Sequence, residues 1–242
     1  MSIDERDAAA RRTFLKQAAA MAGAAAVVGA VVTPGESRAA DSTTPAAPFV
    51  GYEFFGPDDA AFVEALVNVM CPADQFTPNG VDCGLATFFD RQLAGPFGQG
   101  KGRYMRGPWN PGPPEMGLQL PLTPAQFFKV GLSAANEASV RRFAKPFAQL
   151  SATAADAFLH DVQDGHLNTE SVSLGSWFNA LVYPLFVQAC FSDPLYGGNY
   201  NKVFWKMLGY PGLPATHALD MVQYRGKPYP PAASPKSMLD FG

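Results

Sequence analysis

The residues with the clearest capacity for chemistry are three cysteines, Cys71, Cys83 and Cys190. A thiol can act as a nucleophile, a metal ligand or half of a disulfide, and its compartment largely decides which. In an oxidising compartment, Cys71 and Cys83 could form a disulfide that joins the end of one predicted helix to the start of the next. Cys190 would then be either a buried thiol or one half of a disulfide to another protein.

The three histidines, His160, His166 and His217, do not have the spacing of a metal site. Positions 160 and 166 are six residues apart, which places them on different faces of a helix. His160 with Asp161 and Asp164 could serve as an acid-base group, but an exposed helix end explains these polar residues more simply.

Other signatures of catalysis are also missing from the sequence. No serine or cysteine nucleophile has a recognisable setting, no glycine-rich flavin motif follows a strand, and no Cys-x-x-Cys-His haem motif occurs. The sequence therefore predicts no catalytic, cofactor-binding or metal-binding residue, and we expect the chemistry to belong to a partner.

The N-terminus has the pattern of a twin-arginine export signal. Arg11 and Arg12 are followed by Phe14 and Leu15, then by a mildly apolar Ala, Val and Gly run and small residues, and we expect cleavage after Ala39. The alternative is a membrane anchor, but the run is short for a span of about 20 residues. This route carries proteins that are already folded, often with a bound partner, so the signal predicts a periplasmic protein.

The composition suggests one domain with a large apolar load. The chain has 242 residues and a net charge of -3, with only 16% charged residues but 12% aromatic residues, 19 of them Phe. No basic patch interleaved with aromatics occurs, so nucleic acid is not an expected partner. Low charge with many aromatics indicates either a large core or a surface that faces another protein.

We expect a mostly α, single compact helical domain with long Gly/Pro-rich loops. The predicted organisation is a cleaved signal peptide (1–39), a flexible linker (40–53), the helical domain (54–212) and an extended C-terminal tail (213–242). Apolar periodicity and capping residues predict helices over residues 57–71, 82–94, 123 to either 143 or 147, 151–165, 179–191 and 201–208.

The stretch DPLYGGNY interrupts this helical pattern with a turn. Asp-Pro disfavours helix and Gly-Gly loses much backbone entropy on ordering, so the stretch indicates a specific backbone shape. One hypothesis is that Tyr196, Gly197, Gly198 and Asn199 form a glycine-enabled turn that presents Tyr196 and Trp205 to a partner. The alternative is an internal helix-to-helix turn with Tyr196 packed inward.

Several segments, in this order, resemble the gluconate 2-dehydrogenase subunit 3 family over roughly Phe54 to Gly212. Each segment is short, but their order together with the export signal is specific. The segments are Thr-Pro before Gln126-Phe127, a helix ending at Gly165, DPLYGGNY, Trp205-Lys206 and Gly209-Tyr210-Pro211-Gly212.

The resemblance implies a non-catalytic small subunit of a flavin-dependent sugar, polyol or sugar-acid dehydrogenase. In that family the expected partners are a large flavoprotein of the glucose-methanol-choline type, which holds FAD, and a membrane-bound multihaem cytochrome c, which holds haem c. The large subunit would be exported by the twin-arginine translocase while bound to this chain, and the complex would sit on the periplasmic side of the inner membrane. Cys190 is then a candidate for a disulfide to the large subunit.

A free-standing exported ligand-binding protein is the alternative function. In that case the long loop over residues 95–121, which is dense in Gly and Pro, would cover a ligand pocket.

Overall fold

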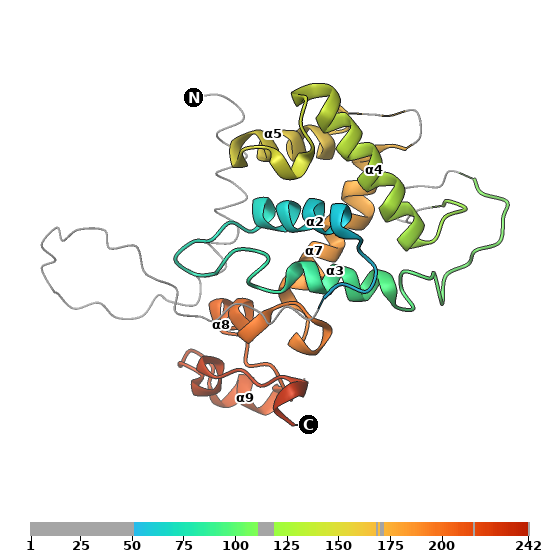
Figure 1. Cartoon of the computed structure of the whole chain (residues 1–242). Helices are drawn as coiled ribbons and strands as arrows, with labels where there is room; N and C mark the ends of the chain where they lie inside the picture. Colours follow the sequence, from blue (N-terminus) through green and yellow to red (C-terminus); the bar gives the residue numbers. More distant parts are fainter. Residues whose placement is uncertain (1–50, 111–118, 168, 170–171, 215, 242) are drawn as a thin grey trace, which may run out of the picture.

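A computed structural model describes residues 51–110, 119–167, 169, 172–214 and 216–241 (Figure 1). These residues are mostly helical, as the sequence predicts, and they contain no β-strand. The α-helices are α2 (Pro57–Met70), α3 (Leu85–Ala94), α4 (Pro124–Phe143), α5 (Ala152–Gln163), α6 (Leu174–Trp177), α7 (Tyr183–Phe191), α8 (Val203–Leu208) and α9 (Ala218–Gln223). Shorter helical turns are η2 (Phe147–Gln149), η3 (Phe178–Val182), η4 (Pro194–Tyr196), η5 (Tyr200–Lys202), η6 (Pro230–Ala233) and η7 (Met238–Asp240).

The predicted export signal is not among these residues. Arg11, Arg12, Phe14 and Leu15 lie outside the part of the chain that the structure describes, as does most of the predicted linker 40–53.

Side-chain caps set the starts of two long helices where the sequence predicts them. At α4, Gln126 N–H donates to Thr123 Oγ1 (3.2 Å) and Thr123 N–H donates to Gln126 Oε1 (2.9 Å), which completes a capping box. At α5, Ser151 Oγ accepts from Ala154 N–H at 3.3 Å. Both predicted starts are confirmed.

Helix α3 begins later than predicted, because Asp82 is not its N-cap. The Asp82 carboxylate accepts from Asn79 Nδ2 at 2.8 Å, and Asp82 N–H donates to Asn79 Oδ1 at 2.9 Å, so this residue belongs to a turn. Gly84 follows with φ of +77°, a conformation that a side chain would disfavour, and the helix starts at Leu85.

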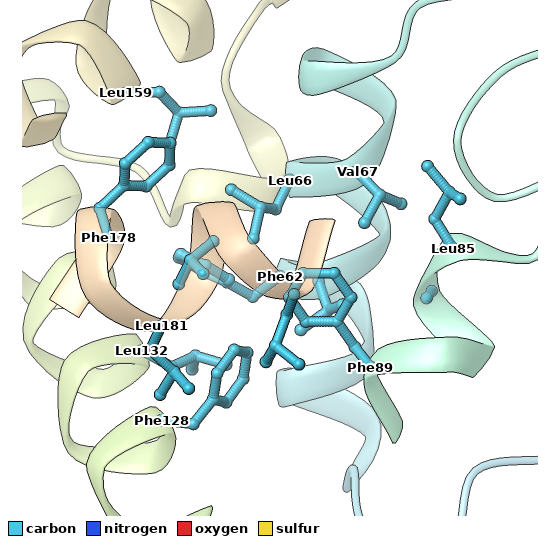
Figure 2. Close-up of a cluster of buried hydrophobic side chains, with 14 of the residues drawn as sticks. Phe62, Leu66, Val67, Leu85, Phe89, Phe128, Leu132, Leu159, Phe178 and Leu181 are labelled. Atoms are coloured by element: carbon cyan, nitrogen blue, oxygen red, sulfur yellow. The ribbon is translucent and has the colours of Figure 1, made fainter. Parts of the chain in front are cut away.

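The core is formed by apolar side chains of every helix from α2 to α8, and Figure 2 shows those of α2, α3, α4, α5 and the η3 segment converging between the helices. Helix α5 lies at one end of the molecule, and α8 and α9 lie at the other (Figure 1). The labelled members of the cluster in Figure 2 are Phe62, Leu66, Val67, Leu85, Phe89, Phe128, Leu132, Leu159, Phe178 and Leu181.

Trp177 is the largest fully buried side chain, and Gly131 makes room for it. A Cβ at Gly131 would lie 2.1 Å from the Trp177 ring, so no larger residue fits there without movement of the indole. The ring packs against Phe62 and Phe128, with centroid distances of 6.4 and 5.9 Å. Helix α4 can therefore approach the α6–η3 segment closely only at a glycine.

Asp90 fastens the start of the domain to α3. Its buried carboxylate accepts from the backbone N–H groups of Glu53, Phe54 and Phe55 at 2.8, 2.9 and 3.0 Å. Three backbone donors on one carboxylate compensate for the burial of its charge.

The C-terminal residues are not the extended tail that we predicted. The described residues of this segment, 213–214 and 216–241, contain α9 and two short helical turns, and they fold back onto the domain. Met238 N–H donates to Asp193 Oδ2 at 2.9 Å, and Lys202 Nζ donates to Asp240 Oδ2 at 2.6 Å. These bonds join the chain end to the DPLYGGNY turn and to the η5 turn that follows it, a long-range contact that local sequence pattern does not encode.

His217 clasps this C-terminal part through both ring nitrogens. Nδ1 lies 3.1 Å from Asp220 Oδ2, and Nε2 lies 3.2 Å from the carbonyl oxygen of Gly212. Tyr229 O–H also donates to Asp220 Oδ2, at 2.8 Å. The hydrogen bond to Asp220 and the bond to Gly212 raise the pKa of His217 above its usual 6.5, because only the imidazolium can donate to both acceptors.

This geometry predicts a stability that falls as the pH rises. The folded-state pKa of His217 lies above the unfolded value, so its stabilisation is complete below about pH 6.5 and is lost as the pH rises through the folded pKa. The gap in urea midpoint between the wild type and His217→Gln should therefore shrink between about pH 6 and pH 9. A gap that stays constant or widens would contradict the clasp, and His166→Gln, at an exposed histidine, is the matched control.

Candidate docking face

The DPLYGGNY stretch forms a rigid connector between α7 and α8. Asp193 caps the η4 turn, its Oδ1 accepting from Leu195 N–H at 2.9 Å. Gly197 has φ of +102°, and a Cβ there would lie 3.2 Å from Thr87 Cγ2 on α3. Gly198 lies against α7, where a Cβ would be only 2.3 Å from the carbonyl oxygen of Ala189. Each glycine is thus required for a different reason, the first for its backbone angle and the second for close approach.

Asn199 connects the two helix ends from the inside of the turn. Its side chain is fully buried, and Nδ2 donates to the carbonyl oxygen of Ser192 (3.1 Å) after α7. Oδ1 accepts from Phe204 N–H (3.0 Å) in the first turn of α8. Asn199 is therefore a structural residue of the turn and does not itself contact a partner.

Trp205 is not the surface residue that we predicted. Only 6% of it is exposed, its indole N–H donates to the carbonyl oxygen of Phe191 at 2.9 Å, and its ring meets Tyr210 edge-on at 5.1 Å. Tyr196, in contrast, is half exposed, so it does not pack inward as the alternative reading of the turn requires. Of the two aromatic residues proposed to face a partner, only Tyr196 lies at the surface.

The structure adds an apolar surface along α7 that the sequence reasoning missed. Its members are 37–50% exposed and are Tyr183, Val187, Phe191, Leu195 and Tyr196, which we call the docking face. Tyr183, Val187 and Phe191 are four residues apart, so they lie on one side of α7, and Leu195 and Tyr196 follow in the η4 turn. The opposite side of α7, with Leu185 and Ala189, is buried in the core.

The docking face carries no charge along the helix. No Asp, Glu, Lys or Arg occurs from Val172 to Ser192, which includes all of α6, η3 and α7. This charge-free run contains the most apolar stretch of the predicted mature chain. The sequence does not indicate which side of it faces outward. Exposed apolar surface of this kind is typical of an interaction site.

Pro184 shapes the helix without breaking it. Tyr183 N–H bonds to the carbonyl oxygen of Phe178, five residues earlier, so η3 is a π-helical turn directly before the proline. The whole segment Leu174–Phe191 is long and apolar enough to cross a membrane, but half of it is buried inside the domain. A core helix with one exposed side accounts for this composition.

The folded chain end lies beside this surface. Asp193, which caps the turn, also accepts from Met238, and both Met238 and Phe241 are exposed. Asp240 forms an ion pair with Lys202, and hydrogen bonds from Lys202 and Ser237 lower the pKa of its carboxyl to about 2. The surface next to the docking face therefore consists of apolar side chains and one ion pair, Lys202–Asp240, whose charges balance.

The loop proposed to cover a ligand pocket borders only a small cavity. Its volume is about 190 Å³, and its lining includes Arg103 and Trp109 of the loop with Phe127 and Leu181 of the core. Ligand pockets usually measure about 300–1,000 Å³. This cavity is therefore a weaker candidate for function than the docking face.

All three cysteines are free thiols buried in the structure. Cys71 and Cys83 lie close to each other, but no bond joins them in this structure. Cys190 is 4% exposed, which does not support a disulfide from Cys190 to another protein and agrees with the alternative of a buried thiol. Among the described residues, no group of three or more His, Cys, Asp or Glu side chains could hold a metal ion.

Comparison with protein families gives the resemblance firm support. A family model described as gluconate 2-dehydrogenase subunit 3 matches residues 57–212, from the first residue of α2 to Gly212, four residues after the end of α8. No curated protein and no solved structure shows a significant match. Since the family model covers more than half of the chain, including the whole docking face, this protein belongs to the gluconate 2-dehydrogenase subunit 3 family.

Proposed function

We propose that this chain is the non-catalytic small subunit of a periplasmic flavin-dependent dehydrogenase that acts on a sugar, polyol or sugar acid. The members of its family are described as subunits of a dehydrogenase, so the chain is part of a multi-subunit complex. In the proposal, the chain binds the large flavoprotein subunit through the docking face and carries it through the twin-arginine translocase.

The docking face is the observation that carries this proposal. Five large apolar side chains follow one side of a helix and a rigid turn, and the helix itself is uncharged. Such a surface suits the apolar core of a protein interface, because it would gain free energy when a partner removes it from water. It offers little to an acidic or basic polymer, which would need charged groups.

The cofactors belong to the partners in this scheme. FAD would be held by a large subunit of the glucose-methanol-choline type, and haem c by a multihaem cytochrome c that accepts electrons at the inner membrane. Arg11 and Arg12 support the export step, because a paired arginine before an apolar run is the pattern of the twin-arginine signal.

Immunoprecipitation of the full chain from the periplasm of its native host tests this function. The expected result is a large partner with flavin absorbance, identified by mass spectrometry, and loss of both proteins from the periplasm in the Arg11→Lys, Arg12→Lys variant. A colourless monomer would overturn the proposal and favour the free-standing ligand-binding protein. In the control, an unrelated twin-arginine substrate should still reach the periplasm in the same cells.

A further inference from the structure

We propose that Cys71 and Cys83 are joined by a disulfide in the exported protein, and that this bond stabilises the loop between α2 and α3 that supports the docking face. The inference depends on the export step of the proposed function, because disulfides persist in oxidising compartments.

The two thiols already contact each other. Both sulfurs approach the same carbonyl oxygen, that of Pro78, Cys83 Sγ at 3.4 Å and Cys71 Sγ at 3.8 Å, and each thiol shifts the pKa of the other. A disulfide needs the two Cβ atoms about 3.5–4.5 Å apart, and the shared contact with Pro78 brings both cysteine side chains to one place in the loop.

The loop between them is held in place by other contacts. Val81 N–H donates to Asn68 Oδ1 on α2 at 3.0 Å, and a Cβ at Gly80 would lie 2.3 Å from the carbonyl oxygen of Val67. The chain after α2 is therefore pressed against that helix, and this packing holds Cys83 near Cys71. The disulfide would link two positions that non-covalent contacts have already aligned.

The position of the pair connects it to the docking face. Cys71 follows the last residue of α2, and Cys83 lies two residues before α3. The carbonyl oxygen of Cys83 accepts from Tyr200 N–H at 3.0 Å, so the loop also holds the end of the DPLYGGNY turn. A bond at this point would tie α2, α3 and the turn that carries Leu195 and Tyr196.

The two cysteines have different roles in forming the bond. Cys71 is 8% exposed and Cys83 is fully buried, so Cys71 is the first to meet an oxidant. The hydrogen bond from Cys83 lowers the pKa of Cys71, whereas that bond and burial raise the pKa of Cys83. The lower pKa gives Cys71 more of the thiolate that attacks a disulfide.

The reaction is thiol–disulfide exchange with the disulfide of an oxidised thiol–disulfide exchange protein. The Cys71 thiolate attacks one sulfur, forms a mixed disulfide and releases a thiolate of the oxidant. The Cys83 thiolate then attacks the Cys71 sulfur and releases the second. The pair loses two protons and two electrons, and the oxidant disulfide becomes two thiols.

Cys190 provides an internal control. It lies close enough to the pair to interact electrostatically with Cys71, and burial raises the pKa of its thiol well above the usual value. Its thiolate is therefore disfavoured and its side chain is buried, so we expect it to stay reduced.

Counting thiols in the exported protein tests the assignment. The exported protein is released from the periplasm into denaturant that contains an alkylating agent. Only Cys190 should react until a reductant is added, after which Cys71 and Cys83 react as well. In Cys190→Ser, no thiol should react before reduction. Peptide mapping without reductant should recover Cys71 and Cys83 in one linked species.

Three reactive thiols in exported protein would overturn the assignment, and so would a disulfide that includes Cys190. The Arg11→Lys, Arg12→Lys variant, recovered from the cytoplasm, separates this question from export. Treated with oxidised glutathione, it should form the same link, and failure to form it would count against the geometry. If no chain reaches the periplasm, the export proposal fails while this second measurement still decides the disulfide.

Discussion

Replacing Gly198 with alanine is expected to cost about 3 kcal/mol of folding stability and to remove the complex with it. The new Cβ would lie 2.3 Å from the carbonyl oxygen of Ala189 and 3.0 Å from its carbonyl carbon. These are backbone atoms of α7, so they cannot rotate away as a side chain can. Relief would require α7 and the turn to separate, which would break the Asn199 bonds to both helix ends.

Urea denaturation of the purified variant, followed by circular dichroism, measures this effect. Gly56→Ala is the matched control, because the nearest atom to its new Cβ is 4.0 Å away and its φ is −73°. A Gly198→Ala variant with the denaturation midpoint of the wild type would show that the close approach to Ala189 does not constrain the turn.

Placing charge on the docking face is expected to disrupt the complex without unfolding the subunit. In the double variant Tyr183→Glu, Val187→Glu, two carboxylates would have to be buried against the partner, which we expect to weaken binding about 100-fold or more. Both positions are exposed in the subunit alone, so its own stability should change by less than about 1 kcal/mol.

The readout is the flavin absorbance that co-precipitates with the subunit, measured beside its melting temperature. Val140→Glu is the control, since Val140 is similarly exposed but belongs to α4. If the double variant retained as much flavoprotein as Val140→Glu, the docking face would not be the interface.

Helix starts with strong local caps could be predicted from sequence. The Thr123 and Ser151 side chains each bond a backbone N–H three residues on, a local interaction that sequence spacing alone defines. Asp82 has the same residue chemistry, but its carboxylate bonds Asn79 instead, and local pattern could not decide between these two partners.

The orientation of α8 could not be predicted. Asn199, Asn201 and Lys202 all have φ between 49° and 57°, a left-handed conformation that sequences rarely signal outside glycine. These residues rotate the chain before α8 and direct Trp205 inward, so the periodicity within the helix gave no indication of which side would be buried.

The docking face could be predicted from sequence only in part. Tyr196 was identified from its turn, and the four-residue spacing of Tyr183, Val187 and Phe191 was present in the sequence. In a charge-free helix, however, both sides look alike, so the exposed side is decided by what packs on the other. Only the three-dimensional contacts of Leu185 and Ala189 with the core make that choice.

The folded chain end limits where a reporter can be attached to this subunit. Met238 bonds to the aspartate that caps the turn carrying Leu195 and Tyr196, and Phe241 lies three residues further along. A fluorescent protein or affinity tag fused at the C-terminus would follow residues that lie beside the proposed docking face, and a fusion before residue 1 would precede the predicted export signal. Labels for imaging or capture therefore belong on exposed positions of α5, at the opposite end of the molecule (Figure 1).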